Sequence, residues 1–267
     1  MIRTKPYEFM VTYTPQQEWI ERGGIMLWLA FFFSEFGAGI YFVSLFFEFP
    51  LVRLTGWLIS LVLGGALHMA YLGRPTRGWR ILLHPSTSEL SRGLWLLLLF
   101  GVIGFFQVVP VVFPALPWDG GSLALRIPMG VICILVVAHG FTTMNAVSAI
   151  PSWNLTMMIP LSVISGIWIG SQFVEVTAVF GGADITGVEM WSRWLLFCYM
   201  AASALYLWGI MNADMTARAS AKRILAGDKS AGFYIGVVII GIIIPLIITL
   251  ALWGGSFKSS SWVIEIP

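Results

Sequence analysis

Glu35, His68 and His139 are ionisable side chains that lie inside long apolar stretches of this sequence. An ionisable group within a membrane segment is costly to bury, so such residues mark candidate functional sites. Carboxyl and imidazole groups are also side chains that commonly transfer protons. We therefore predict that Glu35 and His139 belong to a proton path. The alternative is that these groups only hydrogen-bond neighbouring helices.

The depth of each polar group follows from its position along its helix. With a rise of about 1.5 Å per residue, Glu35 and His139 fall at about the same depth, near the middle of the membrane. His68 lies about one turn from the end of its helix, and Asn145 lies nearly two turns from the end of its own. The same arithmetic separates His68 from His139 by about 10 Å along the membrane normal, which is poor geometry for two imidazoles sharing one haem.

Other signatures of a bound group are missing from the sequence. Cys133 and Cys198 lie in apolar stretches and lack the spacing of metal ligands. No phosphate-binding loop, dinucleotide fingerprint or nucleophile elbow is present. We predict no haem and no metal on this chain, and no nucleic acid among its partners.

A cationic stretch at residues 73–92 separates two apolar runs. Gly73 and Pro75 predict the end of the preceding helix, because glycine tolerates a left-handed cap and proline cannot extend the hydrogen-bond ladder. Ser86, followed by Glu89 three residues later, predicts a capping box at the start of the next helix. The sequence therefore predicts a short arginine-rich loop at a membrane surface.

The composition identifies the class of protein that holds these residues. The chain has 267 residues, of which 58% are hydrophobic and 10% are charged, which is typical of a polytopic membrane protein. A membrane span needs about 20 mostly apolar residues. Seven stretches qualify, at 24–49, 52–72, 93–115, 124–150, 155–180, 190–212 and 231–254. We predict an all-α bundle embedded in a lipid bilayer, in which Gln107 makes an interhelical hydrogen bond.

The seven spans divide into two predicted groups. Residues 24–150 form a first four-helix bundle, residues 151–254 form a reduced second group of three helices, and 1–23 and 255–267 are terminal segments. An odd number of spans places the termini on opposite sides. The far side holds only Arg53, Arg126, Arg193 and Lys258 of the 15 basic residues. The bias of basic residues therefore predicts that the N-terminal segment and the 73–92 loop are cytoplasmic.

Several elements, in this order, resemble the NrfD-like membrane subunits, the family that includes the membrane subunit of polysulfide reductase. The matching residues are Gly37-Ala38-Gly39, His68 to Trp79 with its Leu72-Gly73-Arg74-Pro75 core, Pro85-Ser86-Thr87-Ser88 with Leu90-Ser91, Phe141-Thr142, Pro151, Trp153-Asn154 and Pro160. The resemblance covers residues 24–170. The family commonly has eight membrane helices, whereas this chain is predicted to have seven.

The resemblance implies a haem-free subunit in the inner membrane of a prokaryote that reacts with menaquinone or ubiquinone. Such a subunit exchanges electrons with a docked, ferredoxin-like iron-sulfur protein, which serves a large catalytic subunit, often a molybdenum or tungsten enzyme. The quinone site of the family lies in the first bundle near the docking face. The residues of this chain in that region are Trp19, Arg22, His68, Tyr71, Arg74, Arg77 and Asn145.

On this basis we predict a quinone ring between the first, second and fourth helices. His68 or Asn145 would hydrogen-bond a ring carbonyl, and Arg74 or Arg77 would stabilise a reduced, anionic ring or the docked partner. Two other functions stay open. One is a secondary transporter that uses Glu35 and His139 as a proton relay, although residues 24–115 and 124–212 show no convincing repeat. The other is a passive membrane anchor.

Overall fold

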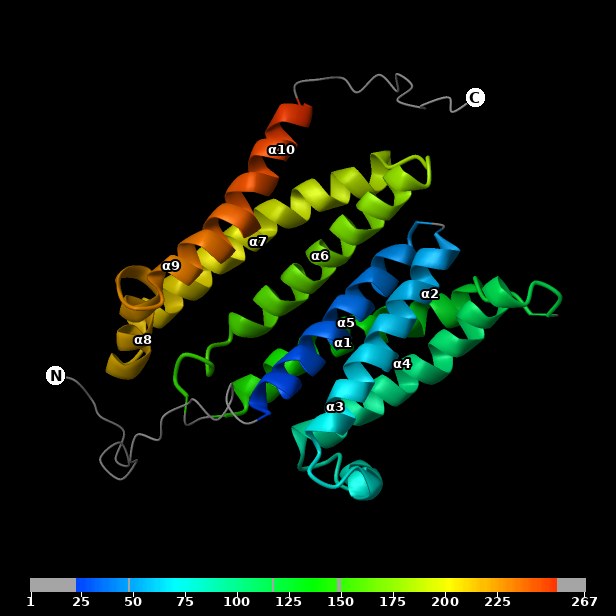
Figure 1. Ribbon diagram of the computed structural model, residues 1–267, viewed down its shortest axis with the longest axis horizontal. Helices are drawn as coiled ribbons and strands as arrows, with labels where there is room; N and C mark the ends of the chain where they lie inside the picture. Colours follow the sequence, from blue (N-terminus) through cyan, green and yellow to red (C-terminus); the bar gives the residue numbers. More distant parts are fainter. Residues whose placement is uncertain (1–22, 48, 117, 148–149, 254–267) are drawn as a thin grey trace.

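The computed structural model describes residues 23–47, 49–116, 118–147 and 150–253, and Trp19 and Arg22 lie outside these ranges. Within them the chain is helical without strands, and seven helices are long and apolar enough to cross a membrane (Figure 1). This confirms the predicted fold class. The predicted and observed starts of the spans differ by at most four residues. The third span, for example, begins at Glu89, whereas its predicted start is residue 93. The seven spans are Gly24–Ser44, Pro50–Tyr71, Glu89–Val112, Leu123–Asn145, Met158–Phe180, Thr186–Asn212 and Ser230–Leu250.

The spans correspond to labelled elements of Figure 1. Five of them are single helices: α1 (Gly24–Ser44), α4 (Glu89–Val112), α5 (Leu123–Asn145), α6 (Met158–Phe180) and α7 (Thr186–Asn212). The second span joins α2 (Pro50–Leu58), the π-helical segment η3 (Ile59–Gly64) and α3 (Gly65–Tyr71). The last span joins α9 (Ser230–Gly232), the π-helical segment η5 (Phe233–Ile243) and α10 (Ile244–Trp253). Two shorter elements lie between spans: the 3-10 segment η4 (Pro75–Leu83) and α8 (Met215–Ala226).

Helix α1 lies at the centre of the bundle and packs against the second span, α5 and α6. Glycines allow this close approach. A Cβ on Gly37 would collide with the backbone of Ser60 in η3, and a Cβ on Gly39 would collide with the carbonyl of Gly166 in α6. Within a bilayer the hydrophobic effect does not drive helices together, and small residues at such crossings allow the close backbone packing that does. These glycines therefore have a packing role.

Three polar contacts, made at Tyr41, Ser44 and Leu45, fix α1 further. The Tyr41 hydroxyl donates a hydrogen bond of 2.8 Å to the Gln107 Oε1 of α4, which confirms the predicted interhelical role of Gln107. At the C-terminal end of α1, Arg53 donates a hydrogen bond to the Ser44 carbonyl, and Arg126 donates one to the Leu45 carbonyl. The last carbonyls of a helix have no partner within it. These two arginines provide partners for carbonyls at the end of α1, which lies at Ser44 rather than at the predicted 49.

The 73–92 loop differs from its prediction in one detail. Helix α3 ends at Tyr71, as Gly73 and Pro75 indicated. The cap of α4 is Ser88, whose side chain accepts a hydrogen bond from the Ser91 amide at 3.3 Å, so the predicted capping box of Ser86 and Glu89 is wrong. Ser88 directly precedes the first helical residue and has the extended backbone that a cap requires, whereas Ser86 lies in the preceding turn.

The last span contacts the rest of the chain only weakly. Among the described residues, none in its most apolar window is buried, and α10 packs against α7. Helices α6 and α7 pack against each other, and α6 also packs along α1. The start of α1, η4 and α8 lie at the same end of the bundle (Figure 1).

Candidate functional site

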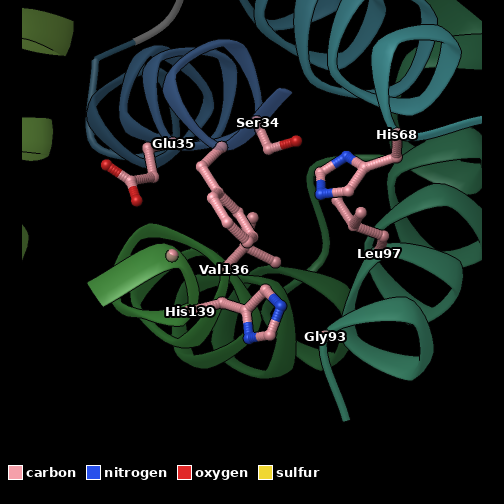
Figure 2. A pocket seen from close by; sticks show the side chains of 9 residues that line it. Ser34, Glu35, His68, Gly93, Leu97, Val136 and His139 are labelled. Carbon is pink, nitrogen blue, oxygen red and sulfur yellow. The ribbon is translucent and has the colours of Figure 1, made fainter. Parts of the chain in front are cut away.

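A small cavity in the bundle brings together Glu35, His68 and His139. Its volume is about 10 Å³, which is the space of about one water molecule. In Figure 2 the imidazole rings of His68 and His139 lie on one side of the Glu35 side chain, and the carboxyl group of Glu35 points away from them. The lining residues are Phe31, Ser34, Glu35, His68, Gly93, Leu97, Val136, His139 and Gly140. They come from α1, α3, α4 and α5.

His68 reaches this cavity because its side chain turns back along its own helix. Its Nδ1 lies 2.8 Å from the Gly64 carbonyl, the last residue of η3. A carbonyl only accepts, so Nδ1 carries the proton of this hydrogen bond and Nε2 is left for another partner. Gly64 lies one turn, about 6 Å, closer to the membrane centre than His68. The separation of about 10 Å from His139 that the sequence predicts was worked out from positions along the helices and does not include this turn of the side chain.

His139 is held between two helices other than its own. Its ring contacts the Phe31 ring of α1 edge-on at 5.8 Å between centroids, and Phe31 makes a similar contact of 5.3 Å with His68. A Cβ on Gly93 of α4 would also collide with the His139 ring. Glycine at position 93 therefore makes the space that this imidazole occupies.

Glu35 lies against α5 at Gly140, where an added Cβ would collide with its Oε1. The residue as a whole is half-buried, but Oε1 is sealed from solvent and has no hydrogen-bond partner within the described residues. A buried carboxyl oxygen without a partner is costly, because the hydrogen bonds it made in water are not replaced. A hydrogen bond from a ligand or a water molecule to this atom would remove that cost.

The other predicted site residues lie elsewhere. The Asn145 amide donates to the carbonyls of Trp153 and Leu155, at 2.9 and 3.1 Å, and so fastens the segment between α5 and α6. Tyr71, Arg74 and Arg77 are exposed at the end of the bundle and line neither of the cavities described here.

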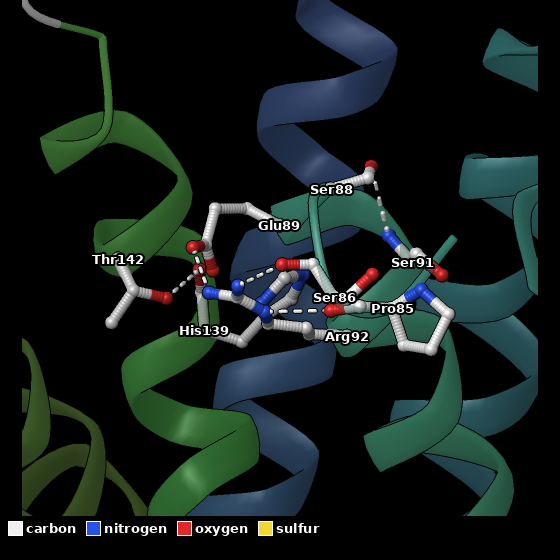
Figure 3. Close-up of polar contacts among 8 residues, drawn as sticks. All are labelled: Pro85, Ser86, Ser88, Glu89, Ser91, Arg92, His139 and Thr142. Carbon is white, nitrogen blue, oxygen red and sulfur yellow. Dashed lines mark hydrogen bonds and ion pairs between the residues drawn. The ribbon is translucent and has the colours of Figure 1, made fainter.

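The loop beside the cavity is tied to α4 by Arg92 (Figure 3). Its guanidinium donates to the carbonyls of Pro85 and Ser86, at 2.8 and 2.9 Å, and to the Glu89 carboxylate. Because Arg92 directly precedes Gly93, these bonds connect the loop to the helix turn that contacts His139. Arg92 is also exposed, but these hydrogen bonds give it a structural role in holding the loop against α4.

A second, larger cavity lies on the other side of Glu35, between α1, α5 and α6. Its volume is about 230 Å³, and it is open on one side. Glu35, Phe31 and Gly140 line both cavities. The residues around it are Trp28, Phe31, Phe32, Glu35, Phe36, Gly140, Phe141, Met144, Ser165, Gly166 and Ile169. Sequence reasoning missed this groove, although Trp28, Phe32 and Phe36 recur at the four-residue spacing that places side chains on one helix face.

The described residues include no group of three or more histidine, cysteine, aspartate or glutamate side chains that could hold a metal ion. Comparisons of the chain with protein-family models, with curated proteins and with solved structures find no match. The geometry of the two cavities and the resemblance in residues 24–170 are therefore the basis for a functional proposal.

Proposed function

We propose that this chain is the quinone- or quinol-reactive membrane subunit of a multi-subunit oxidoreductase. It exchanges electrons between the quinone pool and a docked iron-sulfur protein, which serves a large catalytic subunit. The observation that carries the proposal is the convergence of Glu35, His68 and His139, from three helices, on one cavity inside the membrane-spanning part. The resemblance to NrfD-like subunits supports the same function.

The chemistry of quinones explains why such a cluster is useful. Reduction of a quinone to a quinol consumes two protons together with two electrons, so a site within the membrane needs groups that pass protons. The Nε2 of His68 is available for a hydrogen bond, the Oε1 of Glu35 has no partner among the described residues, and one water fits in the cavity that both residues line. A passive anchor needs no such cluster.

The partner surface in this proposal is the cationic end of the bundle. Arg74, Arg77 and Arg80 are exposed on η4 and the segment before it. Exposed charges of one sign steer a partner of the opposite sign and fix its orientation. An acidic face on the iron-sulfur protein would complement this surface.

The first test is the turnover of the intact complex with quinone and with a soluble dye. His68→Ala is expected to abolish quinone-linked turnover and leave dye-linked turnover of the catalytic subunit unchanged. His84→Ala is the matched control, because His84 is an exposed loop histidine that lines neither cavity. Loss of both activities together in the His68 variant, with the complex still assembled, would count against a role for His68 with quinone.

The second test identifies the partners. Purification of the chain from its native membrane in a mild detergent, followed by mass spectrometry, is expected to recover an iron-sulfur subunit and a large cofactor-containing enzyme. Recovery of this chain alone, or only with copies of itself, would contradict the proposal. A transport assay on the same material would then be the next measurement.

A further inference from the structure

The space around the histidines is too small for a quinone ring. An apolar cavity of about 150 Å³ binds benzene, whereas the cavity between His68 and His139 has about 10 Å³. The groove between α1, α5 and α6 has about 230 Å³ and is therefore large enough for a substituted six-membered ring. If the chain binds quinone, the groove has the room for it.

The wall of the groove suits a flat aromatic ligand. Trp28 and Phe32 stack at 6.3 Å between ring centroids, with 16° between their planes. Phe32 and Phe36 continue the row at 5.9 Å and 18°. Aromatic rings bind other flat rings by offset stacking and edge-to-face contacts. The opposite wall carries Met144 and Ile169, which are apolar and adaptable.

One residue that lines the groove carries a polar atom without a partner in the described part of the chain. This atom is the Oε1 of Glu35, which is buried. A carboxylate accepts a hydrogen bond from the hydroxyl of a quinol, and a protonated carboxyl donates one to the carbonyl of a quinone. Ser165 offers a second polar group, since its hydroxyl donates to the Ser162 carbonyl at 3.0 Å and keeps lone pairs free to accept.

We propose that the ring of a quinone or quinol binds in this groove between α1, α5 and α6, with Glu35 as the hydrogen-bond partner of a ring oxygen. The cavity at His68 and His139 then holds water on the far side of Glu35. This inference rests on the proposed function and replaces the ring position between the first, second and fourth helices that the sequence suggested. Glu35 separates the ring from the histidines and touches both spaces.

The test is a binding titration of the purified full chain in detergent with a fluorescent hydroxyquinoline N-oxide, an analogue of quinols whose emission is quenched on binding. Ile169→Trp fills the groove and is expected to weaken binding at least about tenfold. Val176→Trp is the matched control, because Val176 is an exposed apolar residue two turns further along α6 and does not line the groove. This variant is expected to bind like the wild type.

Substitutions of Glu35 test the polar contact. Glu35→Leu removes the hydrogen-bonding group and is expected to weaken analogue binding about tenfold or more. Glu35→Gln keeps a donor and an acceptor and is expected to cost about threefold or less. Equal binding by wild type and Glu35→Leu would show that the groove takes up apolar molecules, such as lipid chains, without recognising a ring oxygen, and would overturn the inference.

Two further outcomes separate this inference from the proposed function. If the wild type binds the analogue, Ile169→Trp binds it equally well and His68→Gln loses it, the ring lies at the histidines. The inference is then wrong while the proposed function stands. If the wild type does not bind the analogue at all, both are contradicted.

Discussion

Gly93→Ala tests directly whether the His139 ring lies against the backbone of α4. A Cβ at this position would collide with three atoms of the imidazole, and the Phe31 ring also contacts this imidazole. Overfilling a packed site typically costs about 1–3 kcal/mol. Alanine also favours the helix over glycine by about 0.5–1 kcal/mol, so the effect of the collision has to be measured against a second glycine.

Gly65 is that reference, because a Cβ there has no heavy atom within 4 Å. We expect Gly65→Ala to be neutral or slightly stabilising, and Gly93→Ala to be less stable than Gly65→Ala by about 1–3 kcal/mol. For a chain of this size, the difference corresponds to about 2–12 °C in Tm. Scanning fluorimetry of both variants in the same detergent measures it.

A double-mutant cycle assigns the cost to the imidazole. His139→Ala removes the ring, so adding Gly93→Ala to that variant is expected to cost nothing further, which gives a coupling of about 1–3 kcal/mol between the two positions. If Gly93→Ala proves as stable as Gly65→Ala, the ring does not contact α4, and the description of the cavity is refuted.

Two more predictions concern stability. Tyr41→Phe leaves the buried Gln107 Oε1 without its donor and is expected to lower the free energy of unfolding, measured by thermal unfolding, by about 1–3 kcal/mol. The double variant that also carries Gln107→Leu is expected to recover this loss. An unchanged Tm of Tyr41→Phe would contradict the prediction. Outside the membrane, the hydrogen bond from Arg223 lowers the pKa of Asp228 from 3.8 to about 2. The ion pair therefore stabilises the fold above pH 3.8, and its contribution disappears as the pH falls through about 2. Carbon-13 NMR titration of the carboxyl should find this midpoint, and Arg223→Met should return it to near 3.8; equal midpoints would exclude the ion pair.

Local patterns explain which parts of the molecule could be predicted. Each membrane span is a run of apolar residues, and a bilayer forces such a run into a helix because its backbone groups have no other partners. The number of spans follows from these apolar runs. The stop after Tyr71 follows from the local signals of Gly73 and Pro75. The interhelical role of Gln107 follows from its polar side chain inside a span. The cap of α4 was assigned to Ser86 instead of Ser88, because several serines fit the motif and only the backbone conformation distinguishes them.

The sequence by itself determined the helices and the ionisable residues within them, since both depend only on residue type and on neighbours along the chain. Only the tertiary structure decided which cavities those ionisable residues line. The bend of His68 toward the Gly64 carbonyl, the space left by Gly93 and the groove beside Glu35 all depend on atoms from different helices. Cavities arise where side chains of separate helices fail to fill the space between them, and the spacing along one helix carries no information about that space.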